Sequence, residues 1–128
     1  MDQKMYDAGM KMRRQVAGNE YVDKAMANVD DFNRDFQRIV TQYCWGEAWG
    51  DDTLPPRERS ILNLGILAAA GKMHEFEIHF RAAKNNGLTK EELRAVLIQI
   101  AVYCGIPVGV DCFRIAKQAF AADAAKKP

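Results

Sequence analysis

The sequence has no long apolar run, and this absence argues against a protein that spans a membrane. The longest apolar stretch, Ile61 to Ala70, contains Asn63 and Gly65 and falls short of the ~20 residues that a membrane-spanning helix needs. The first residues lack the charged and then apolar order of a secretory signal. We therefore expect a cytoplasmic location and no membrane partner.

The sequence also lacks an excess of charge of either sign. Its 128 residues carry 18 Lys and Arg against 17 Asp and Glu, a formal net charge of +1. Such a chain creates no bulk field that would gather nucleic acid, so we expect no nucleic-acid partner. The fractions of hydrophobic (48%) and charged (27%) residues are typical of globular proteins, and the length suits one domain, residues 1–128.

Cysteine and histidine are scarce. Cys44, Cys104 and Cys112 form an odd number, and no pair has the C-x-x-C spacing of a redox motif or zinc knuckle, so we expect buried, unpaired thiols. His74 and His79 are five residues apart, which turns them ~140° from each other on a helix. A zinc-binding pair needs a spacing of four, so we expect no metal site. No glycine-rich phosphate loop or dinucleotide fingerprint is present, and nothing indicates a nucleotide or a flavin.

Helix signals are abundant instead, and signals of β-strands are few. Apolar residues recur at spacings of three and four, the period of a helix that buries one face. Glycine, asparagine and proline interrupt this period at short intervals, so the connections are short. We predict an all-α domain, a bundle of six or seven helices near residues 5–16, 20–28, 32–44, 57–70, 73–86, 93–101 and 108–122.

Three of these helices carry more specific signals. Thr89, with Glu92 three residues later, forms a capping box and predicts a helix start. Asp30 or Asp31 is placed to cap the helix near residues 32–44. The helix at 57–70 is apolar nearly all round, so we expect other helices or a neighbouring subunit to cover it.

Glu75 and His79 are the first candidates for chemistry. They are four residues apart and therefore share a face of the predicted helix 73–86. A carboxylate beside an imidazole orients the ring and raises its pKa, which favours the protonated form, a general acid near neutral pH. The alternative is a surface ion pair on an amphipathic helix, and the spacing alone does not distinguish the two.

Glu47 is a second candidate, because it lies between Trp45 and Trp49. A carboxylate among aromatic rings is partly desolvated, and desolvation raises its pKa and makes it a proton donor. The alternative is a carboxylate that faces water while the tryptophans pack. Arg59 and Arg81 belong to a group of cations around the same region; arginine suits carboxylates, although a solvated surface position explains each one equally well.

Six short segments have an order and spacing that are specific, although each segment alone is a weak signal. They are Asn33-Arg34-Asp35-Phe36-Gln37, Cys44-Trp45-Gly46-Glu47-Ala48-Trp49, Arg59-Ser60, Glu75…His79 with Arg81-Ala82-Ala83, Asn86-Gly87-Leu88-Thr89-Lys90-Glu91-Glu92, and Tyr103-Cys104-Gly105-Ile106-Pro107. On these segments the chain resembles the carboxymuconolactone decarboxylase family over nearly its whole length, with the main match at about residues 30–122.

The resemblance implies an AhpD-like helical fold and a carboxy-lyase activity on a small molecule. The implied reaction converts 4-carboxymuconolactone to 3-oxoadipate enol-lactone and carbon dioxide, in the protocatechuate branch of the β-ketoadipate pathway. It implies no metal or organic cofactor, because the lactone carbonyl of the substrate itself accepts the electrons. Members of the family form ring-like homo-oligomers, so the resemblance also implies a homo-oligomer, with a hexamer favoured.

The resemblance also assigns roles to the candidate residues. His79 would be the proton donor or the partner of the oxyanion, oriented by Glu75, and Glu47 would be a second candidate acid. Arg59 and Arg81 would be candidate anchors for the carboxylates of the substrate. Trp45 and Trp49 would form a wall of the pocket.

The family that the chain resembles belongs to a wider superfamily, which includes thiol peroxidases of the AhpD type. The residues of this chain disfavour the peroxidase mechanism. The two cysteines of those peroxidases would fall on Lys72 and Glu75, their histidine on His79 and their glutamate on Ser60, so the thiolate that disulfide exchange needs is missing. Two alternatives stay open. One is a related enzyme that acts on another carboxylated lactone, and the other is a non-catalytic helical oligomer that serves as a binding module.

Overall fold

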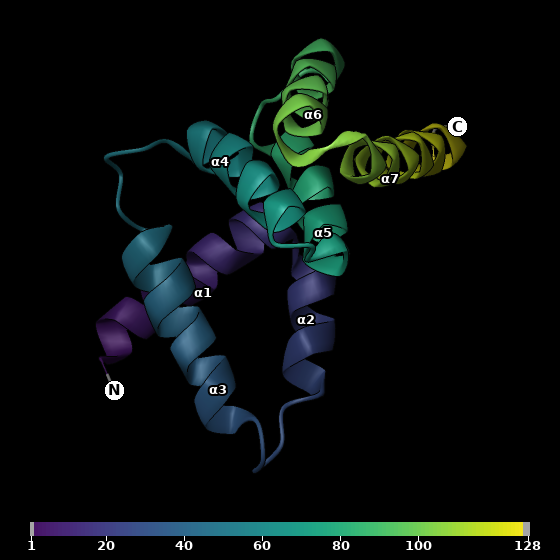
Figure 1. The fold of residues 1–128 in the computed structure, drawn as a ribbon. Coiled ribbons are helices and arrows are strands. Elements are labelled where there is room, and N and C mark those ends of the chain that lie inside the picture. The colour runs from purple at the N-terminus through teal and green to yellow at the C-terminus, as the bar shows by residue number, and fades with distance from the viewer. Residues whose placement is uncertain (1, 127–128) are drawn as a thin grey trace. The chain divides into compact units, whose positions relative to one another are not determined.

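The structure, a computed structural model, describes residues 2–126, and in these residues all regular secondary structure is helical (Figure 1). This confirms the predicted all-α class. The elements are α1 (Gln3–Ala17), α2 (Asn19–Ala27), α3 (Arg34–Ile39), the π-helix η1 (Val40–Ala48), α4 (Pro56–Ala69), α5 (Met73–Asn85), α6 (Lys90–Cys104) and α7 (Ile106–Lys126).

The chain divides into two compact units. Unit 1 is Met1–Pro56 and contains α1, α2, α3 and η1, whereas unit 2 is Arg57–Pro128 and contains nearly all of α4 and the helices α5 to α7. The single domain predicted for residues 1–128 stays a prediction. Within residues 2–126 no helix is long and apolar enough to cross a membrane, and the predicted cytoplasmic location stays a prediction too.

In unit 1, α1 and η1 cross at a distance that only glycine permits. A Cβ atom on Gly9 would overlap the carbonyl oxygen of Thr41 and would lie 2.9 Å from the amide nitrogen of Gly46. A Cβ atom on Gly46 would lie 2.6 Å from the carbonyl oxygen of Met5. Because both backbones touch here, the crossing fixes the position along α1 at which η1 is held.

A buried guanidinium adds a polar connection to this crossing. Arg13 of α1 is 4% exposed, and its Nη1 donates to Gln37 Oε1 of α3 and to Thr41 Oγ1 of η1, each at 3.1 Å. A buried cation without acceptors is costly, so these two bonds favour the arrangement of α1 along the α3–η1 segment.

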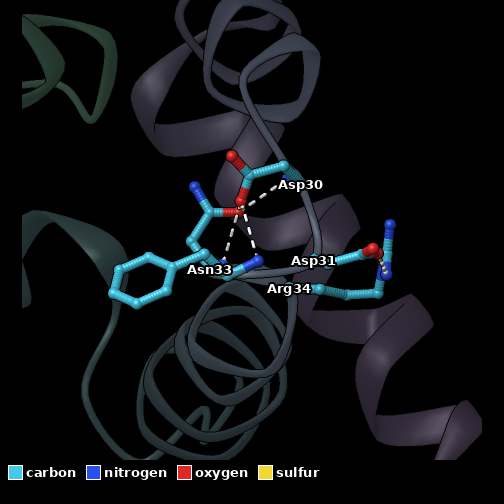
Figure 2. Close-up of polar contacts among 5 residues, drawn as sticks. Asp30, Asp31, Asn33 and Arg34 are labelled. Carbon is cyan, nitrogen blue, oxygen red and sulfur yellow. Dashed lines mark hydrogen bonds and ion pairs between the residues drawn. The ribbon is translucent and has the colours of Figure 1, made fainter.

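The turn before α3 is closed by Asp30 and Asn33 (Figure 2). The Asp30 carboxylate accepts from the backbone N–H groups of Phe32 and Asn33 at 2.9 and 3.2 Å, and Asn33 Oδ1 accepts from the Asp30 N–H at 2.8 Å. Asp30 thus makes the side-chain bonds of an N-terminal cap, and the Arg34 N–H donates to the Asp30 carbonyl at 3.0 Å, so the prediction that Asp30 or Asp31 caps this segment is confirmed for Asp30. The helix α3 begins after this turn, with Asn33 at its boundary and no side-chain bond from Asn33 to α3, and Asp31 pairs with Arg34 at 2.6 Å.

The third predicted helix, near 32–44, also extends further than expected. It continues past Cys44 to Ala48 as the π-helix η1, a form that the 3.6-residue period of apolar residues does not predict. The apolar stripe of this helix is exposed in the structure: Phe36, Ile39 and Tyr43 are 62, 48 and 66% exposed. Another protein surface can cover an exposed apolar stripe of this kind.

In unit 2, α4 and α5 form an antiparallel pair joined by a short turn in which Gly71 has φ 72°, a backbone conformation that favours glycine. Together with α6 and α7 they enclose one apolar core. Its buried members are Leu64, Ala68, Phe76, Phe80, Ala83, Leu88, Leu93, Leu97, Ile100, Cys112, Ile115, Ala116 and Ala119. Other helices cover α4 on one side only, because Leu62 and Ile66 on its other side are 53 and 51% exposed.

The start of α6 follows the sequence prediction closely. Thr89 Oγ1 accepts from the Glu92 N–H at 3.1 Å and Glu92 Oε1 accepts from the Thr89 N–H at 3.0 Å, so the predicted capping box is confirmed. Glu92 also pairs with Arg57 of α4, which connects the first turns of the two helices. The final helix begins at Ile106 rather than near 108, because Pro107 is tolerated in a first turn.

We expect Gly9→Ala to lower the free energy of unfolding by about 1–3 kcal/mol, because the new Cβ would overlap a backbone oxygen that can move only if the helices separate. Gly65→Ala is the matched control: a Cβ on Gly65 of α4 meets nothing within 4 Å. There the substitution should stabilise the helix, by up to about 1 kcal/mol. Thermal melts at one protein concentration measure both changes, and an unaltered or higher Tm for Gly9→Ala would contradict the close crossing.

Candidate active site

The rotation of α5 about its axis decides which of its polar residues can form a site. Phe76 and Phe80 are fully buried in the core of unit 2, with ring centroids 6.2 Å apart. His79 immediately precedes Phe80 and is half-buried, and Glu75 lies one turn earlier on the same face and is exposed. Glu75 and His79 therefore share one face of α5, at the edge of the core, as the spacing predicted.

His79 contacts α4 through a residue that the sequence reasoning did not select. The amide nitrogen Nδ2 of Asn63 lies 3.3 Å from His79 Nδ1. An amide NH2 group can only donate, so in this geometry Nδ1 accepts and does not carry a hydrogen. A neutral imidazole with this bond carries its single N–H hydrogen on Nε2.

The predicted direction of the His79 pKa is wrong. The sequence reasoning expected the Glu75 carboxylate to raise this pKa and favour the protonated ring. In the structure, burial lowers the pKa of His79 below its ordinary value of 6.5, and Glu75 only partly offsets that effect. The exposed carboxylate is screened by water, whereas the ring has lost part of its hydration. The site therefore favours a neutral imidazole near pH 7.

A second polar pair connects the same two helices further along. Ser60 of α4 is fully buried, and its hydroxyl accepts from the Asn86 side-chain amide at 2.8 Å. Asn86 is the C-cap residue of α5, so this bond fixes the end of α5 against the first turns of α4. In the sequence, the sign of these two pairs is that Ser60 and Asn63 are polar residues at and within the apolar segment of α4.

The two predicted carboxylate anchors, Arg59 and Arg81, lie on different faces. Arg59 precedes Asn63 by four residues and shares its face of α4. Arg81 follows His79 by two residues, so it points ~160° away around α5, and its Nη2 pairs with Glu77 at 3.2 Å. The structure therefore brings Arg59, and not Arg81, to the face that carries the Asn63–His79 bond.

The three remaining predicted site residues belong to unit 1. The rings of Trp45 and Trp49 pack together with centroids 5.1 Å apart, and both side chains are buried. Glu47, between them in η1, is exposed. The predicted desolvation of this carboxylate is therefore absent in the single chain, and the tryptophans pack while Glu47 faces water. Convergence of these residues with His79 on one pocket stays a prediction.

The three cysteines are free, as expected, but their burial differs. Cys44 is exposed, Cys104 is partly buried and Cys112 is fully buried. Burial raises the pKa of Cys112 to about 11, and the pKa of Cys44, whose side chain is still exposed, is raised by partial loss of hydration around its sulfur. These two thiols therefore disfavour the thiolate that disulfide exchange requires.

Fold and site together define a class of protein: an all-helical chain with a neutral imidazole between two antiparallel helices, and without a pair of cysteines beside it. The chain belongs to the carboxymuconolactone decarboxylase family, whose model matches residues 34–118. The match begins at α3 and ends within α7, so it includes parts of both units. The resemblance inferred from the short sequence segments is thereby confirmed.

Two relatives cover nearly the whole chain. The chain is 34% identical over 119 residues to a 4-carboxymuconolactone decarboxylase of Acinetobacter baylyi, which covers 93% of this chain and 89% of that protein. It is also 34% identical over 118 residues to the nitrosuccinic acid decarboxylase npaB of Metarhizium robertsii, covering 92% and 82%. A 48-residue match to a 4-carboxymuconolactone decarboxylase of Pseudomonas putida is 44% identical, covering 37% of this chain and 100% of that sequence.

We expect His79 to titrate below pH 6.5 in the folded protein. Because its folded pKa lies below its unfolded pKa, the unfolding free energy should fall as the pH drops from about 6.5 and level off below the folded pKa. An NMR titration of the ring C–H signals in a His74→Gln background, which leaves one imidazole, measures this pKa. A value above 6.5 would mean that the charge of Glu75 outweighs burial.

Proposed function

We propose that this protein is a cofactor-independent carboxy-lyase that converts 4-carboxymuconolactone to 3-oxoadipate enol-lactone and carbon dioxide. Its place would be the protocatechuate branch of the β-ketoadipate pathway. The observation that supports this most is the similarity, over more than nine-tenths of the chain, to a decarboxylase that is named for this substrate. The neutral His79 beside Asn63 provides a hydrogen-bond donor of the kind that the reaction needs.

The reaction needs few groups from the protein. The departing carboxylate is attached to a carbon that is conjugated, through an alkene, to the lactone carbonyl. When the bond to carbon dioxide breaks, its electron pair moves through the alkene onto the carbonyl oxygen and gives a dienolate. A proton then adds to carbon and restores the carbonyl. The protein must hold the substrate, stabilise the oxyanion and supply that proton.

We assign these tasks to the residues as follows. His79 donates a hydrogen bond to the dienolate oxygen, and Glu75 helps to orient the ring. Glu47 is the second candidate acid, for delivery of the proton to carbon, once it is shielded from water. Trp45 and Trp49 are assigned to the wall of the pocket.

Arg59 is our proposed anchor for a carboxylate of the substrate. It lies on the same face of α4 as Asn63, one turn nearer the N-terminus of that helix, where the helix dipole also favours an anion. Guanidinium groups bind carboxylates with two parallel hydrogen bonds. Arg81 is a weaker candidate, because its pair with Glu77 holds it on another face of α5.

A second candidate function follows from the other long match. The chain is as similar to a nitrosuccinic acid decarboxylase as to the lactone decarboxylase, 34% in both cases. In nitrosuccinic acid a nitro group adjoins a carboxylate and can accept the electron pair, as the lactone carbonyl does. The same oxyanion partner would serve both reactions, so the substrate is decided by the anchors and the shape of the pocket.

We also propose that the protein assembles into a homo-oligomer, with a hexamer favoured. The support is the amount of apolar surface on α6 and the start of α7 in unit 2. Val102, Tyr103, Ile106 and Val110 are 71, 83, 69 and 60% exposed, which is unusual for large apolar side chains that lie so close together in sequence. A second copy of the chain is the partner that the family resemblance implies.

We expect purified protein, incubated with a chelator and fresh 4-carboxymuconolactone, to form the enol-lactone rapidly when followed by NMR. His79→Gln should lower kcat by about 10²–10⁴-fold, because it removes the oxyanion partner. Arg114→Gln, on the exposed surface of α7, is the matched control and should keep full activity.

Nitrosuccinic acid is tested in parallel, and turnover of that acid alone would transfer the proposal to the second candidate. No turnover of either acid by folded protein would favour a non-catalytic binding module.

We expect sedimentation velocity to show a species several times heavier than 14.4 kDa. Val102→Glu should shift it toward smaller species, because a charge would be buried in the interface. Gln118→Glu, which adds the same charge at another exposed position of unit 2, should leave the distribution unchanged. A wild-type protein that sediments as a monomer would overturn the proposed assembly.

A further inference from the structure

We propose that Asn63 is a positioning residue, which holds His79 as the neutral tautomer with its hydrogen on Nε2. The inference rests on the proposed function, in which His79 donates to the oxyanion of the substrate. It assigns a task to a residue of α4 that touches no reacting atom itself and that acts through the 3.3 Å contact between its amide and the ring.

Asn63 is an unusual residue for its place in α4. From Ile61 to Ala69 it is the only side chain with a polar group, in a segment that otherwise consists of apolar residues and one glycine. Asparagine is a poor helix former compared with leucine or alanine, so its presence there does not serve the helix. It is half-buried, and its amide meets a half-buried imidazole. Buried polar groups are as a rule hydrogen-bonded, and the partner that the structure gives this amide is the imidazole of His79.

The orientation of this amide decides the tautomer of the ring. With Nδ2 toward the ring, the amide donates, Nδ1 accepts, and the ring hydrogen is on Nε2. With Oδ1 toward the ring, Nδ1 would have to carry the hydrogen and Nε2 would present a lone pair. Only the first arrangement allows Nε2 to donate to an oxyanion, whereas the second turns a lone pair toward developing negative charge.

The contact also fixes the direction of the ring. His79 extends from α5, and Asn63 extends from α4 in the same unit, so the bond is made between two helices. The same two helices are joined by Ser60 and Asn86, further toward the end of α5. Two side-chain bonds between α4 and α5 thus restrict the ring at Nδ1, and fixed orientation of a donor is what electrostatic stabilisation of a transition state requires.

The first test reads the tautomer directly and does not depend on turnover. In ¹⁵N-labelled, full-length protein carrying His74→Gln, NMR at pH 8 distinguishes a ring nitrogen that carries a hydrogen from one that does not. We expect His79 to have its hydrogen on Nε2 in this protein. In Asn63→Asp the carboxylate can only accept, so we expect the hydrogen to move to Nδ1. A hydrogen on Nδ1 before the substitution, or one that stays on Nε2 after it, overturns the proposal.

The second test asks whether the tautomer matters for the reaction. The oxyanion forms only in the transition state, so the loss should fall on kcat and leave KM nearly unchanged. We expect Asn63→Asp to lower kcat by about 10²–10³-fold, the effect of one lost oxyanion donor. Glu58→Gln, an exposed change of charge on the same helix, is the control and should keep kcat. A kcat of Asn63→Asp equal to that of the control overturns the positioning role.

Asn63→Leu covers the possibility that the aspartate variant does not fold, since leucine has nearly the same size and no polar atom. We expect both tautomers to be present in this variant and kcat to fall about tenfold. An unchanged tautomer together with an unchanged kcat overturns the proposal. If the wild-type protein does not act on either acid, the proposed function fails, and the tautomer reading in Asn63→Leu still decides whether Asn63 controls the ring.

Discussion

The packing of Phe76 and Phe80 into the core of unit 2 is the constraint on which the candidate site depends. These two rings are four residues apart and fully buried, so they fix the rotation of α5. Once that rotation is set, His79 must lie at the edge of the core and face α4, and Arg81 must point elsewhere. The polar pairs Asn63–His79 and Ser60–Asn86 then follow from the way α4 packs on the same core. The position of His79 is thus a consequence of apolar packing on the adjacent face.

This dependence explains why much of the fold could be predicted from sequence. Helix ends marked by a specific residue were predicted well, because a cap or a left-handed glycine acts locally. Thr89 with Glu92 at the start of α6 is an example. The capping bonds of Asp30 before α3 were predicted, but the first residue of that helix, Arg34, was not, because the turn that Asp30 and Asn33 close lies between the cap and the helix. The π-helix η1 has no signature in the spacing of apolar residues.

The candidate site shows the same division. The shared face of Glu75 and His79 follows from helix geometry alone and was predicted. The pKa of His79 was predicted in the wrong direction, because spacing shows a nearby charge but not the loss of water around the ring. Asn63 was passed over because its partner is on another helix, 16 residues away in sequence. Interactions within one helix are thus visible in the sequence, whereas burial and contacts between helices require the structure.

The family comparison bears on which residues select the substrate and which serve the decarboxylation itself. Two relatives of equal similarity are named for acids as different as a carboxylated lactone and nitrosuccinic acid. Both names specify decarboxylation. Under the proposed function, a scaffold that presents one well-oriented donor to a developing negative oxygen suits either substrate, since carbon dioxide leaves in both reactions and the substrate itself accepts the electrons. On that proposal, the residues that distinguish the substrates are the proposed anchors and pocket walls, and the donor is common to both.

The positions of the two tryptophans have a practical consequence. Trp45 and Trp49 are the only tryptophans of the chain, and both lie in the η1 region of unit 1, with their rings in contact. Intrinsic tryptophan emission therefore originates in unit 1, while the far-ultraviolet circular dichroism reports on the helices of both units. Comparing the two signals during denaturation would reveal whether the units unfold together or in succession, without any label or substitution.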